Sequence, residues 1–197
     1  MFVQIIEGQV RDADALQRQM QAWKSEVKPG AVGFLGSTSG VTDDGRFIAI
    51  ARFESADAAR KNGDRPEQSA WWKATEPALA NASFTDCTEV DTFLNGGSDD
   101  AGFVQIMKGR AVDPVKLRDM GNQMEDEMKR ARPDVLGGVI GWHGDREFTQ
   151  VIYFTTETEA RAGEATMGDG PEPGPDDWSA LMDGEITFID LNDPKFD

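Results

Sequence analysis

Residues 2–5, Phe-Val-Gln-Ile, recur unchanged at residues 103–106, and this recurrence decides the fold. The same spacing continues without a gap and matches further residues as far as position 60 of the first copy and position 161 of the second. The matched pairs include Gly8 with Gly109, Asp12 with Asp113, Leu16 with Leu117, Leu35 with Leu136, Phe47 with Phe148, Phe53 with Phe154, and Ala59-Arg60 with Ala160-Arg161. Self-similarity at a fixed spacing indicates a repeated structural unit. The chain therefore reads as an internal duplication.

The segment between the two copies is rich in Gly, Ser and Asp, a composition typical of a flexible linker. We expect a first repeat at residues 1–95, a linker at 96–102 and a second repeat at 103–197.

Each repeat shows the same order of elements. In the first, the pattern predicts a strand at 2–10, a helix capped by Asp12, strands at 31–41 and 46–53, a helix capped by Ser55, and a strand at 83–90. In the second, it predicts a strand from 103, a helix capped by Asp113 with Pro114 at its first position, strands at 135–142 and 147–154, a helix with a capping box at 156–159, and a strand at 185–191. The order β-α-β-β-α-β is the ferredoxin-like unit.

Two such halves, each with an aromatic residue ending the third strand directly before a capped helix, resemble the dimeric α/β-barrel superfamily. That group includes antibiotic-biosynthesis-type monooxygenases and haem-degrading monooxygenases. The resemblance implies an α+β fold of two tandem ferredoxin-like βαββαβ repeats, packed sheet to sheet as an internal pseudo-dimeric α/β barrel. Both faces of the first strand are apolar, Phe2 and Ile6 on one and Val3 and Ile5 on the other, which agrees with a sheet covered on both sides. A chain with internal pairing is expected to be monomeric or weakly dimeric.

Composition narrows the partners. The 197 residues carry 20 Lys and Arg against 36 Asp and Glu, a formal net charge of −16. Such a charge repels phosphate backbones and anionic lipids, so we expect no nucleic-acid or membrane partner. The sequence has no apolar run long enough to span a bilayer and no basic segment of a signal peptide, and we expect a cytoplasmic protein.

The residues for metal or nucleotide chemistry are missing from the sequence. One His and one Cys cannot form the usual zinc motifs, and no phosphate-binding glycine motif or nucleophile elbow occurs. We therefore predict no metal and no cofactor. His143 is expected in an exposed hairpin turn, and Cys87 as a buried spectator. The haem-degrading relatives hold iron with a His on the second helix of the unit, where this chain has Trp71, Trp72 and Trp178 instead.

The candidate site residues are aromatic and amide side chains. Trp72 and Trp178 either pack the second helices onto the sheets or line a cleft between helix and sheet. Gln4 and Gln105 lie within apolar strands, so each needs a hydrogen-bond partner, either across the two halves or in a cavity. Arg52 and Tyr153 raise the same question on the third strands. The predicted ligand-binding residues are Gln4, Arg52, Trp72, Gln105, Tyr153 and Trp178, and no catalytic residue is assigned.

The segment 167–177 contains three Pro and is expected to be a loop, either a lid over a cleft or a solvated acidic loop.

Two functions remain open. The resemblance implies a cofactor-independent monooxygenase that oxidises an electron-rich aromatic substrate without metal or flavin. The alternative is a non-catalytic module that binds a small molecule or, through its acidic surface, another protein.

Overall fold

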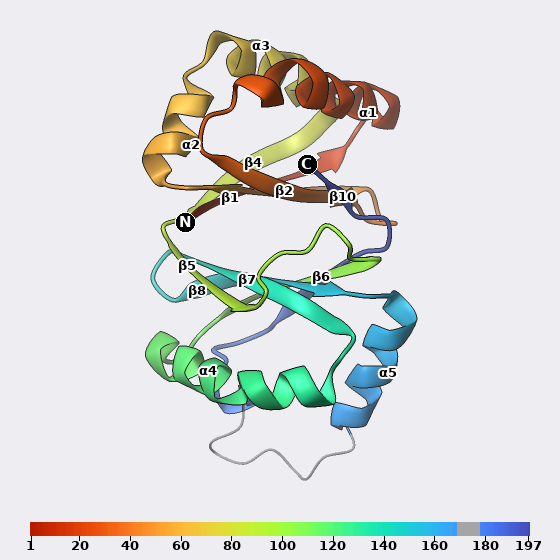
Figure 1. Cartoon of the computed structure of the whole chain (residues 1–197). Coiled ribbons are helices and arrows are strands. Elements are labelled where there is room, and N and C mark those ends of the chain that lie inside the picture. The colour runs from red at the N-terminus through yellow and green to blue at the C-terminus, as the bar shows by residue number, and fades with distance from the viewer. Residues whose placement is uncertain (169–177) are drawn as a thin grey trace. The chain divides into compact units, whose positions relative to one another are not determined.

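The computed structural model describes residues 1–168 and 178–197, and the chain divides into two compact units (Figure 1). Unit 1 consists of Met1–Thr88 and Lys195–Asp197, and unit 2 consists of Glu89–Pro194. The loop predicted at 167–177 falls outside the described residues, apart from the first two positions, which end a helix. Both units combine one antiparallel sheet with helices, so the α+β class predicted from the sequence is confirmed.

Unit 1 has a sheet of five antiparallel strands in the order β10-β2-β3-β1-β4. Its strands are β1 (Phe2–Val10), β2 (Phe34–Val41), β3 (Arg46–Phe53), β4 (Leu79–Cys87) and β10 (Lys195–Phe196), and its helices are α1 (Ala13–Ala22), α2 (Ala56–Gly63) and α3 (Pro66–Thr75). In the central pair Phe2 lies opposite Phe53 and Ile5 opposite Ile50. Side chains alternate between the two faces along a strand, so Gln4 lies on the same face as Phe2.

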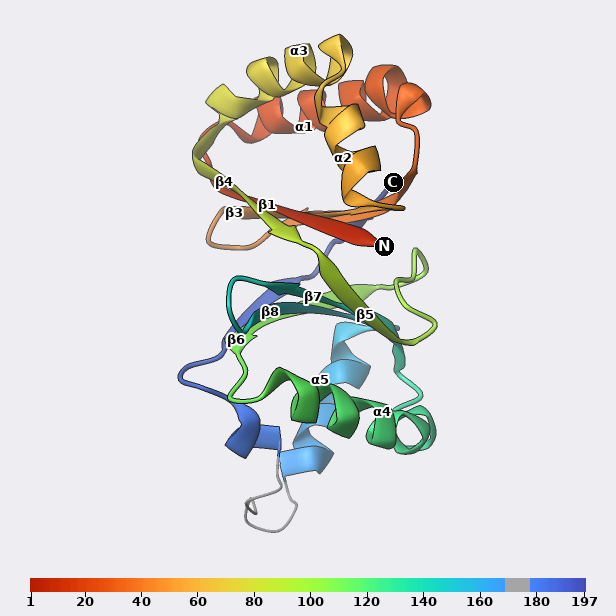
Figure 2. The same cartoon turned by 90° about the vertical axis from the view of Figure 1, so that its left-hand side faces the viewer.

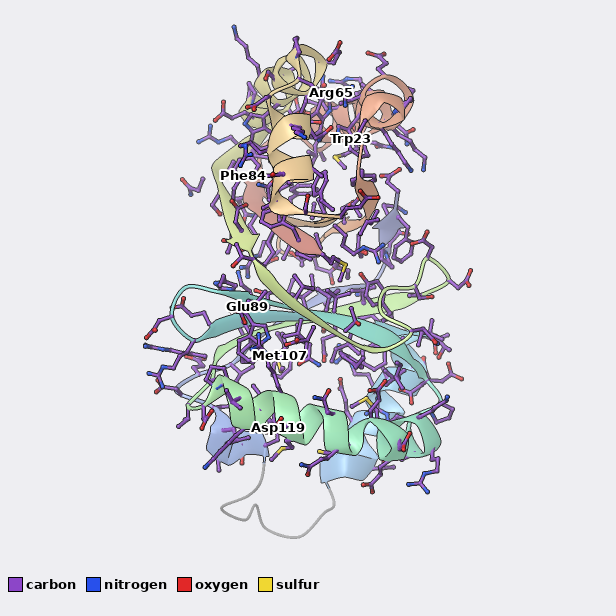
Figure 3. The ribbon with its side chains drawn as sticks, turned by 60° about the vertical axis from the view of Figure 1, so that its left-hand side comes forward. Trp23, Arg65, Phe84, Glu89, Met107 and Asp119 are labelled. Atoms are coloured by element: carbon purple, nitrogen blue, oxygen red, sulfur yellow. The ribbon has the colours of Figure 1, made fainter. Side chains whose placement is uncertain are left out.

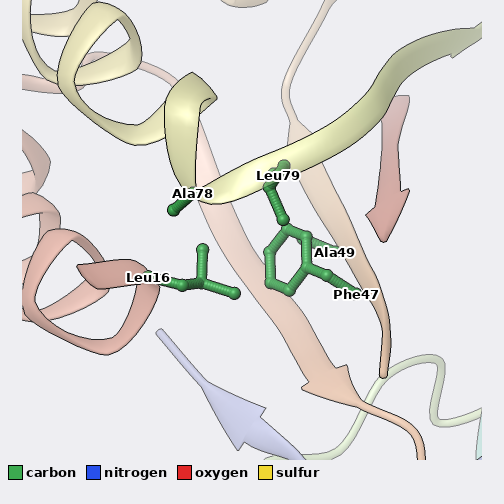
Figure 4. Close-up of a cluster of buried hydrophobic side chains, with 5 residues drawn as sticks. All are labelled: Leu16, Phe47, Ala49, Ala78 and Leu79. Atoms are coloured by element: carbon green, nitrogen blue, oxygen red, sulfur yellow. The ribbon is translucent and has the colours of Figure 1, made fainter. Parts of the chain in front are cut away.

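The three helices of unit 1 lie on one face of its sheet (Figure 2). Helix α1 begins where the carboxylate of Asp12 accepts a hydrogen bond from the backbone N–H of Ala15, as predicted. The helical backbone continues through a π-helical turn, Trp23–Val27, and ends at Lys28–Gly30. A cluster of buried apolar side chains joins helix to sheet (Figure 4): Leu16, Phe47, Ala49, Ala78 and Leu79.

Unit 2 repeats this plan with a sheet in the order β5-β7-β8-β6-β9. Its strands are β5 (Glu89–Leu94), β6 (Phe103–Arg110), β7 (Val135–His143), β8 (Glu147–Phe154) and β9 (Thr187–Leu191), and its helices are α4 (Pro114–Ala131) and α5 (Glu157–Gly168). Asp113 caps α4 by accepting from the N–H groups of Val115 and Lys116. At the start of α5 the hydroxyl of Thr156 accepts from the backbone N–H of Glu159, as expected of a cap, and donates to the Glu159 carboxylate rather than leaving it to the backbone N–H of Thr156.

Two element boundaries differ from the sequence prediction. The second helix of unit 1 is broken into α2 and α3, because Pro66 forces the preceding Arg65 into an extended conformation (ψ 135°). The last strand of the first half, predicted at 83–90, begins already at Leu79. A bulge allows this early start: Asn81 takes a left-handed φ of 53°, and the backbone of β4 passes so close to Gly8 that any side chain there would crowd it.

The compact units do not coincide with the two sequence repeats. Val90, predicted in the last strand of the first half, belongs to β5, which pairs with β7 in the sheet of unit 2. The two residues of β10, at the end of the chain, pair with β2 in the sheet of unit 1. The division into repeats at 1–95 and 103–197 remains a prediction about how the sequence was duplicated. In the structure, β5 of the first repeat belongs to the sheet of unit 2, and β10 of the second repeat belongs to the sheet of unit 1.

The helices of residues 1–168 and 178–197 include no segment with the length and apolar character needed to span a membrane.

Candidate functional site

Unit 1 contains a half-open cavity of about 90 Å³ between its helices and the helix-facing side of its sheet. Strands β1, β2 and β3 form its floor, and α1, α2, α3 and the π-helical turn form its walls. The aromatic lining residues are Trp23, Phe34, Phe47, Phe53, Trp71 and Trp72, and the polar ones are Gln4, Ser37, Asn62, Gln68 and Thr75. The lining is therefore mostly apolar, with six aromatic residues and five uncharged polar ones, as is usual for a small-molecule site.

The aromatic side chains form a connected wall. Trp23 packs edge-to-face on Phe34 with ring centroids 5.1 Å apart, and lies 6.3 Å from Trp71. Trp71 lies 5.9 Å from Trp72, which in turn packs edge-to-face on Phe84 of β4 at 4.8 Å. These geometries are favourable for aromatic pairs, so the rings hold one another in place. Figure 3 shows Trp23 and Phe84 within unit 1.

The three indole groups differ in their hydrogen bonds. Trp23 donates to the side-chain oxygen of Gln68 at 3.0 Å, and Trp71 donates to the backbone oxygen of Gln19 at 2.7 Å. The indole N–H of Trp72 makes no hydrogen bond to any described residue. Of the neighbouring pair on α3, Trp71 is therefore fixed to α1, and Trp72 keeps a donor for a ligand.

Two amides of the cavity are held in defined orientations. Gln68 accepts from Trp23 and, at 3.4 Å, from the amide of Asn62, whose oxygen accepts from Arg65 at 3.0 Å. This chain of bonds leaves the amide N–H₂ of Gln68 without a hydrogen bond among the described residues. Gln4 donates to the carboxylate of Asp86 at 2.8 Å, which leaves its oxygen as an acceptor.

The cavity is electrically neutral, since none of the lining side chains is ionisable. The carboxylate of Asp86, which is exposed, accepts a hydrogen bond from the lining residue Gln4 but does not itself line the cavity. Groups whose pKa departs from its ordinary value lie elsewhere. Hydrogen bonds from Thr42 and Thr155 lower the pKa of Asp44 and Glu159 respectively. The cavity thus holds hydrogen-bond donors and acceptors but no side chain able to act as a general base.

In unit 2 the corresponding position is occupied by charged side chains. Gln105, the counterpart of Gln4, donates to Glu164 and to Asp190, each at 3.2 Å. Arg161 donates to both carboxylates and lies over the ring of Phe103 at 5.1 Å. Burial lowers the pKa of Arg161, but these hydrogen bonds outweigh burial and raise it overall. Each predicted glutamine therefore bonds within its own unit.

The remaining candidates do not join Gln4 and Trp72. Arg52 and Tyr153 alternate with residues that face the helices, so they point to the opposite faces of their own sheets. Tyr153 is fully buried. The Nε atom of Arg52 is buried without a hydrogen bond among the described residues. Trp178 lies in a short 3₁₀ turn, Trp178–Leu181, and packs in a cluster with Met107, Trp142 and Phe148.

The prediction that His143 lies in an exposed hairpin turn is wrong. It is the last residue of β7, pairs with Glu147, and has a side chain only 17% exposed, with Nε2 3.2 Å from the hydroxyl of Thr149. The turn is shorter than expected because Gly144 takes a left-handed φ of 57°. Cys87 is buried, as predicted.

The cavity does not have the residues or the size for haem. His143, the only His of the chain, is in unit 2, and a volume of about 90 Å³ is far below the several hundred Å³ of typical cofactor pockets. Among the residues that the structure describes, no group of three or more His, Cys, Asp or Glu side chains could hold a metal ion.

Sequence reasoning missed several lining residues. Trp23 was expected only as part of the apolar stripe of the first helix, and Ser37 only as part of a strand. Gln68 and Asn62 gave no signal, because their roles depend on the break between α2 and α3. Gly63 gave no signal either, since residues 56–63 and their matched residues 157–164 are identical only at Ala59-Arg60 and Ala160-Arg161.

Comparison with known proteins finds similarity in structure alone. No protein-family model and no curated protein sequence matches the chain. A putative monooxygenase from Lactobacillus acidophilus NCFM has a TM-score of 0.64 at 12% identity, over 96% of this chain and 92% of that one. A putative monooxygenase from Fusobacterium nucleatum has a TM-score of 0.67 at 8% identity, over 96% and 90%.

A third solved structure, that of an anthrone oxidase-like protein, has a TM-score of 0.63 at 10% identity and matches over 99% of this chain and 92% of that one. At such identities the likeness establishes the fold, and it extends through both units. Each unit of the chain therefore has the α+β, ferredoxin-like fold that the order of its elements predicts.

Proposed function

We propose that the cavity of unit 1 binds a small, uncharged aromatic compound, and that the chain oxidises this compound with O₂ without a metal or flavin. The observation that carries the proposal is the cavity itself: an aromatic wall, no charged lining residue, and hydrogen-bond groups of Trp72, Gln68 and Gln4 without a full set of partners. The names of two matched structures, a monooxygenase and an anthrone oxidase-like protein, support the same class of reaction.

The size of the cavity limits the ligand. An apolar cavity of about 150 Å³ holds benzene in another protein, so about 90 Å³ with an open side suits one aromatic ring rather than a fused system. No lining side chain is cationic, so a ligand that carries a full negative charge on entry would lose its hydration without gaining an ion-pair partner. A single-ring phenol such as 1,4-hydroquinone fits both limits.

Such a substrate supplies its own electrons. In the oxidation of 1,4-hydroquinone by one O₂, one oxygen atom enters the ring to give hydroxybenzoquinone and the other leaves as water, so no external reductant is needed. The substrate must first become electron-rich by losing a phenolic proton. The N–H groups of Trp72 and Gln68 are placed to donate to the resulting oxyanion, and donors in a site with little water stabilise such a charge strongly. With no base in the lining, the proton passes to water at the open side.

The second candidate is a module that binds the same compound without turnover, and the absence of an ionisable lining residue favours it. Oxygen consumption separates the two. We expect 1,4-hydroquinone to quench tryptophan emission and, above its spontaneous oxidation, to consume O₂ in the presence of metal-free, flavin-free protein. Quenching without added oxygen uptake would support the binding module. The absence of both quenching and oxygen uptake would contradict the site.

We further propose that the chain acts on this ligand in the cytoplasm, as a monomer or weak dimer. The net charge of −16 supports the absence of nucleic-acid and membrane partners.

A further inference from the structure

Helices α2 and α5 are counterparts in the repeat, and the last two residues of α2, Asn62 and Gly63, both line the cavity and both differ in α5. Both begin directly after a hydroxyl cap, Ser55 in unit 1 and Thr156 in unit 2. The register of the repeat, kept without a gap from there, matches Gly63 with Glu164. Gly63 lines the cavity of unit 1, so the position that is open in one unit carries a long acidic side chain in the other.

In unit 2 the side chain at this position reaches the centre of the sheet. The carboxylate of Glu164 accepts from the amide of Gln105 on β6 at 3.2 Å, and from Arg161 at 3.1 Å. The amide of Gln105 also donates to Asp190, so both of its N–H bonds are used. A glutamate here therefore spans the space between helix and sheet.

In unit 1 no side chain crowds the space directly beside Gly63. A Cβ atom added to Gly63 would meet no atom within 4 Å, and the backbone there is not in the left-handed region, so a side chain is sterically allowed. Gln4 donates one N–H to Asp86 and has the second to spare. Arg60, the counterpart of Arg161, turns instead to Asp57 on its own helix at 2.7 Å.

We propose that Gly63 is the residue that determines the specificity of this site, because its missing side chain is what keeps the cavity of unit 1 open. Among the residues that the structure describes, unit 1 therefore has this site, whereas Glu164 and Arg161 fill the counterpart in unit 2. The identity of the ligand in this inference rests on the proposed function. The open space at Gly63 rests on the structure alone. A side chain at position 63 would then reduce the size of the ligand that the cavity accepts, and a longer side chain would reduce it more.

The test compares Gly63→Glu with wild-type protein in the full chain, by calorimetric titration with 1,4-hydroquinone. We expect one molecule bound per wild-type chain and at least a tenfold weaker affinity in Gly63→Glu. Gly63→Gln, of the same length without the charge, should weaken binding similarly, and Gly63→Ala should weaken it least. Glu164→Gly is the matched control in unit 2 and should leave the affinity of the unit 1 site unchanged, since it alters no residue of that cavity.

A crystal structure of Gly63→Glu decides the inference without any ligand. We expect the introduced carboxylate within hydrogen-bond distance of the Gln4 amide, with the cavity filled. A carboxylate directed into solvent beside an open cavity would overturn the inference, as would wild-type affinity in that variant. If wild-type protein binds no hydroquinone, the proposed function fails, and the variant structure still decides the role of Gly63.

Discussion

At the scale of single residues, the neighbours Trp71 and Trp72 have different roles. The sequence shows only that adjacent helical residues point about 100° apart. The structure adds that the indole of Trp71 is bonded to the backbone of α1, whereas that of Trp72 has no hydrogen-bond partner among the described residues. The first indole thus holds two helices together, and the second is available to a ligand.

Replacing each tryptophan with Phe should separate these roles. Trp72→Phe should weaken the fluorescence response to 1,4-hydroquinone at least severalfold and change stability little, because Phe keeps most of the apolar bulk. Trp71→Phe should cost about 1 kcal/mol of unfolding free energy, since it removes a hydrogen bond and leaves the oxygen of Gln19 without that donor. Urea denaturation and ligand titration of both variants provide the measurements. Equal effects of the two substitutions on binding would contradict this division.

Glu159 provides a test of a hydrogen bond by pH. The hydroxyls of Thr155 and Thr156 lower the pKa of its carboxyl below the ordinary value of 4.5. The pKa in the folded state is below that in the unfolded state, so these bonds stabilise the fold above about pH 4.5 and are lost as the pH falls through the lowered pKa.

Thr155→Ala should raise the pKa of Glu159 toward its ordinary value, because the donor that lowers it most is removed. Thr155→Ser keeps the hydroxyl and should leave the pKa low. An NMR titration of the Glu159 carboxyl carbon measures both, and an unchanged pKa in Thr155→Ala would show that this hydroxyl does not donate in solution.

At the scale of elements, the helix starts were predictable and some ends were not. Asp12, Asp113 and Thr156 all cap helices as their sequence patterns indicate, because a cap depends on contacts only three or four residues away. The bulge at Asn81 depends on a neighbouring strand far away in the sequence, which local patterns do not report. The same holds for β5. The pattern assigned its first two residues to the strand predicted at 83–90, but β5 is a separate strand that pairs with β7 in the sheet of unit 2.

Asp113→Ala should destabilise the chain by about 1 kcal/mol, since two backbone N–H groups at the start of α4 lose their acceptor. Asp113→Asn retains an acceptor oxygen and should cost much less. Chemical denaturation followed by circular dichroism measures the difference. A cost for Asp113→Ala no larger than that for Asp113→Asn would contradict the capping role.

At the scale of the whole molecule, the fold was predictable from the repeat, but the site was only partly so. Gln4 and Trp72, two of the predicted ligand-binding residues, line the same cavity. Arg52 and Tyr153 belong to the opposite sheet faces, which follows from the period of two along a strand once the helix-facing residues are known. Gln68 and Gly63 required knowledge of how α2 and α3 lie over the sheet.

The first repeat should not be stable by itself. In unit 1 all helices lie on one face of the sheet (Figure 2). The strand register puts Val3, Ile5, Ile48 and Ile50 on the other face. Exposure of these four side chains would cost roughly 1.5–3 kcal/mol each. We expect a 1–95 fragment to be insoluble or to self-associate, as judged by sedimentation. A monomeric fragment that unfolds cooperatively would contradict the paired repeats inferred from the sequence.

The central claim is that the cavity of unit 1 is the ligand site, and a crystal structure of the full chain soaked with 1,4-hydroquinone tests it most directly. We predict the ring between Trp72 and the floor of β1 and β3, with a hydroxyl within hydrogen-bond distance of Trp72 Nε1 or Gln68 Nε2. An empty cavity in unit 1 at saturating hydroquinone, or a ring bound only in unit 2, would contradict the account.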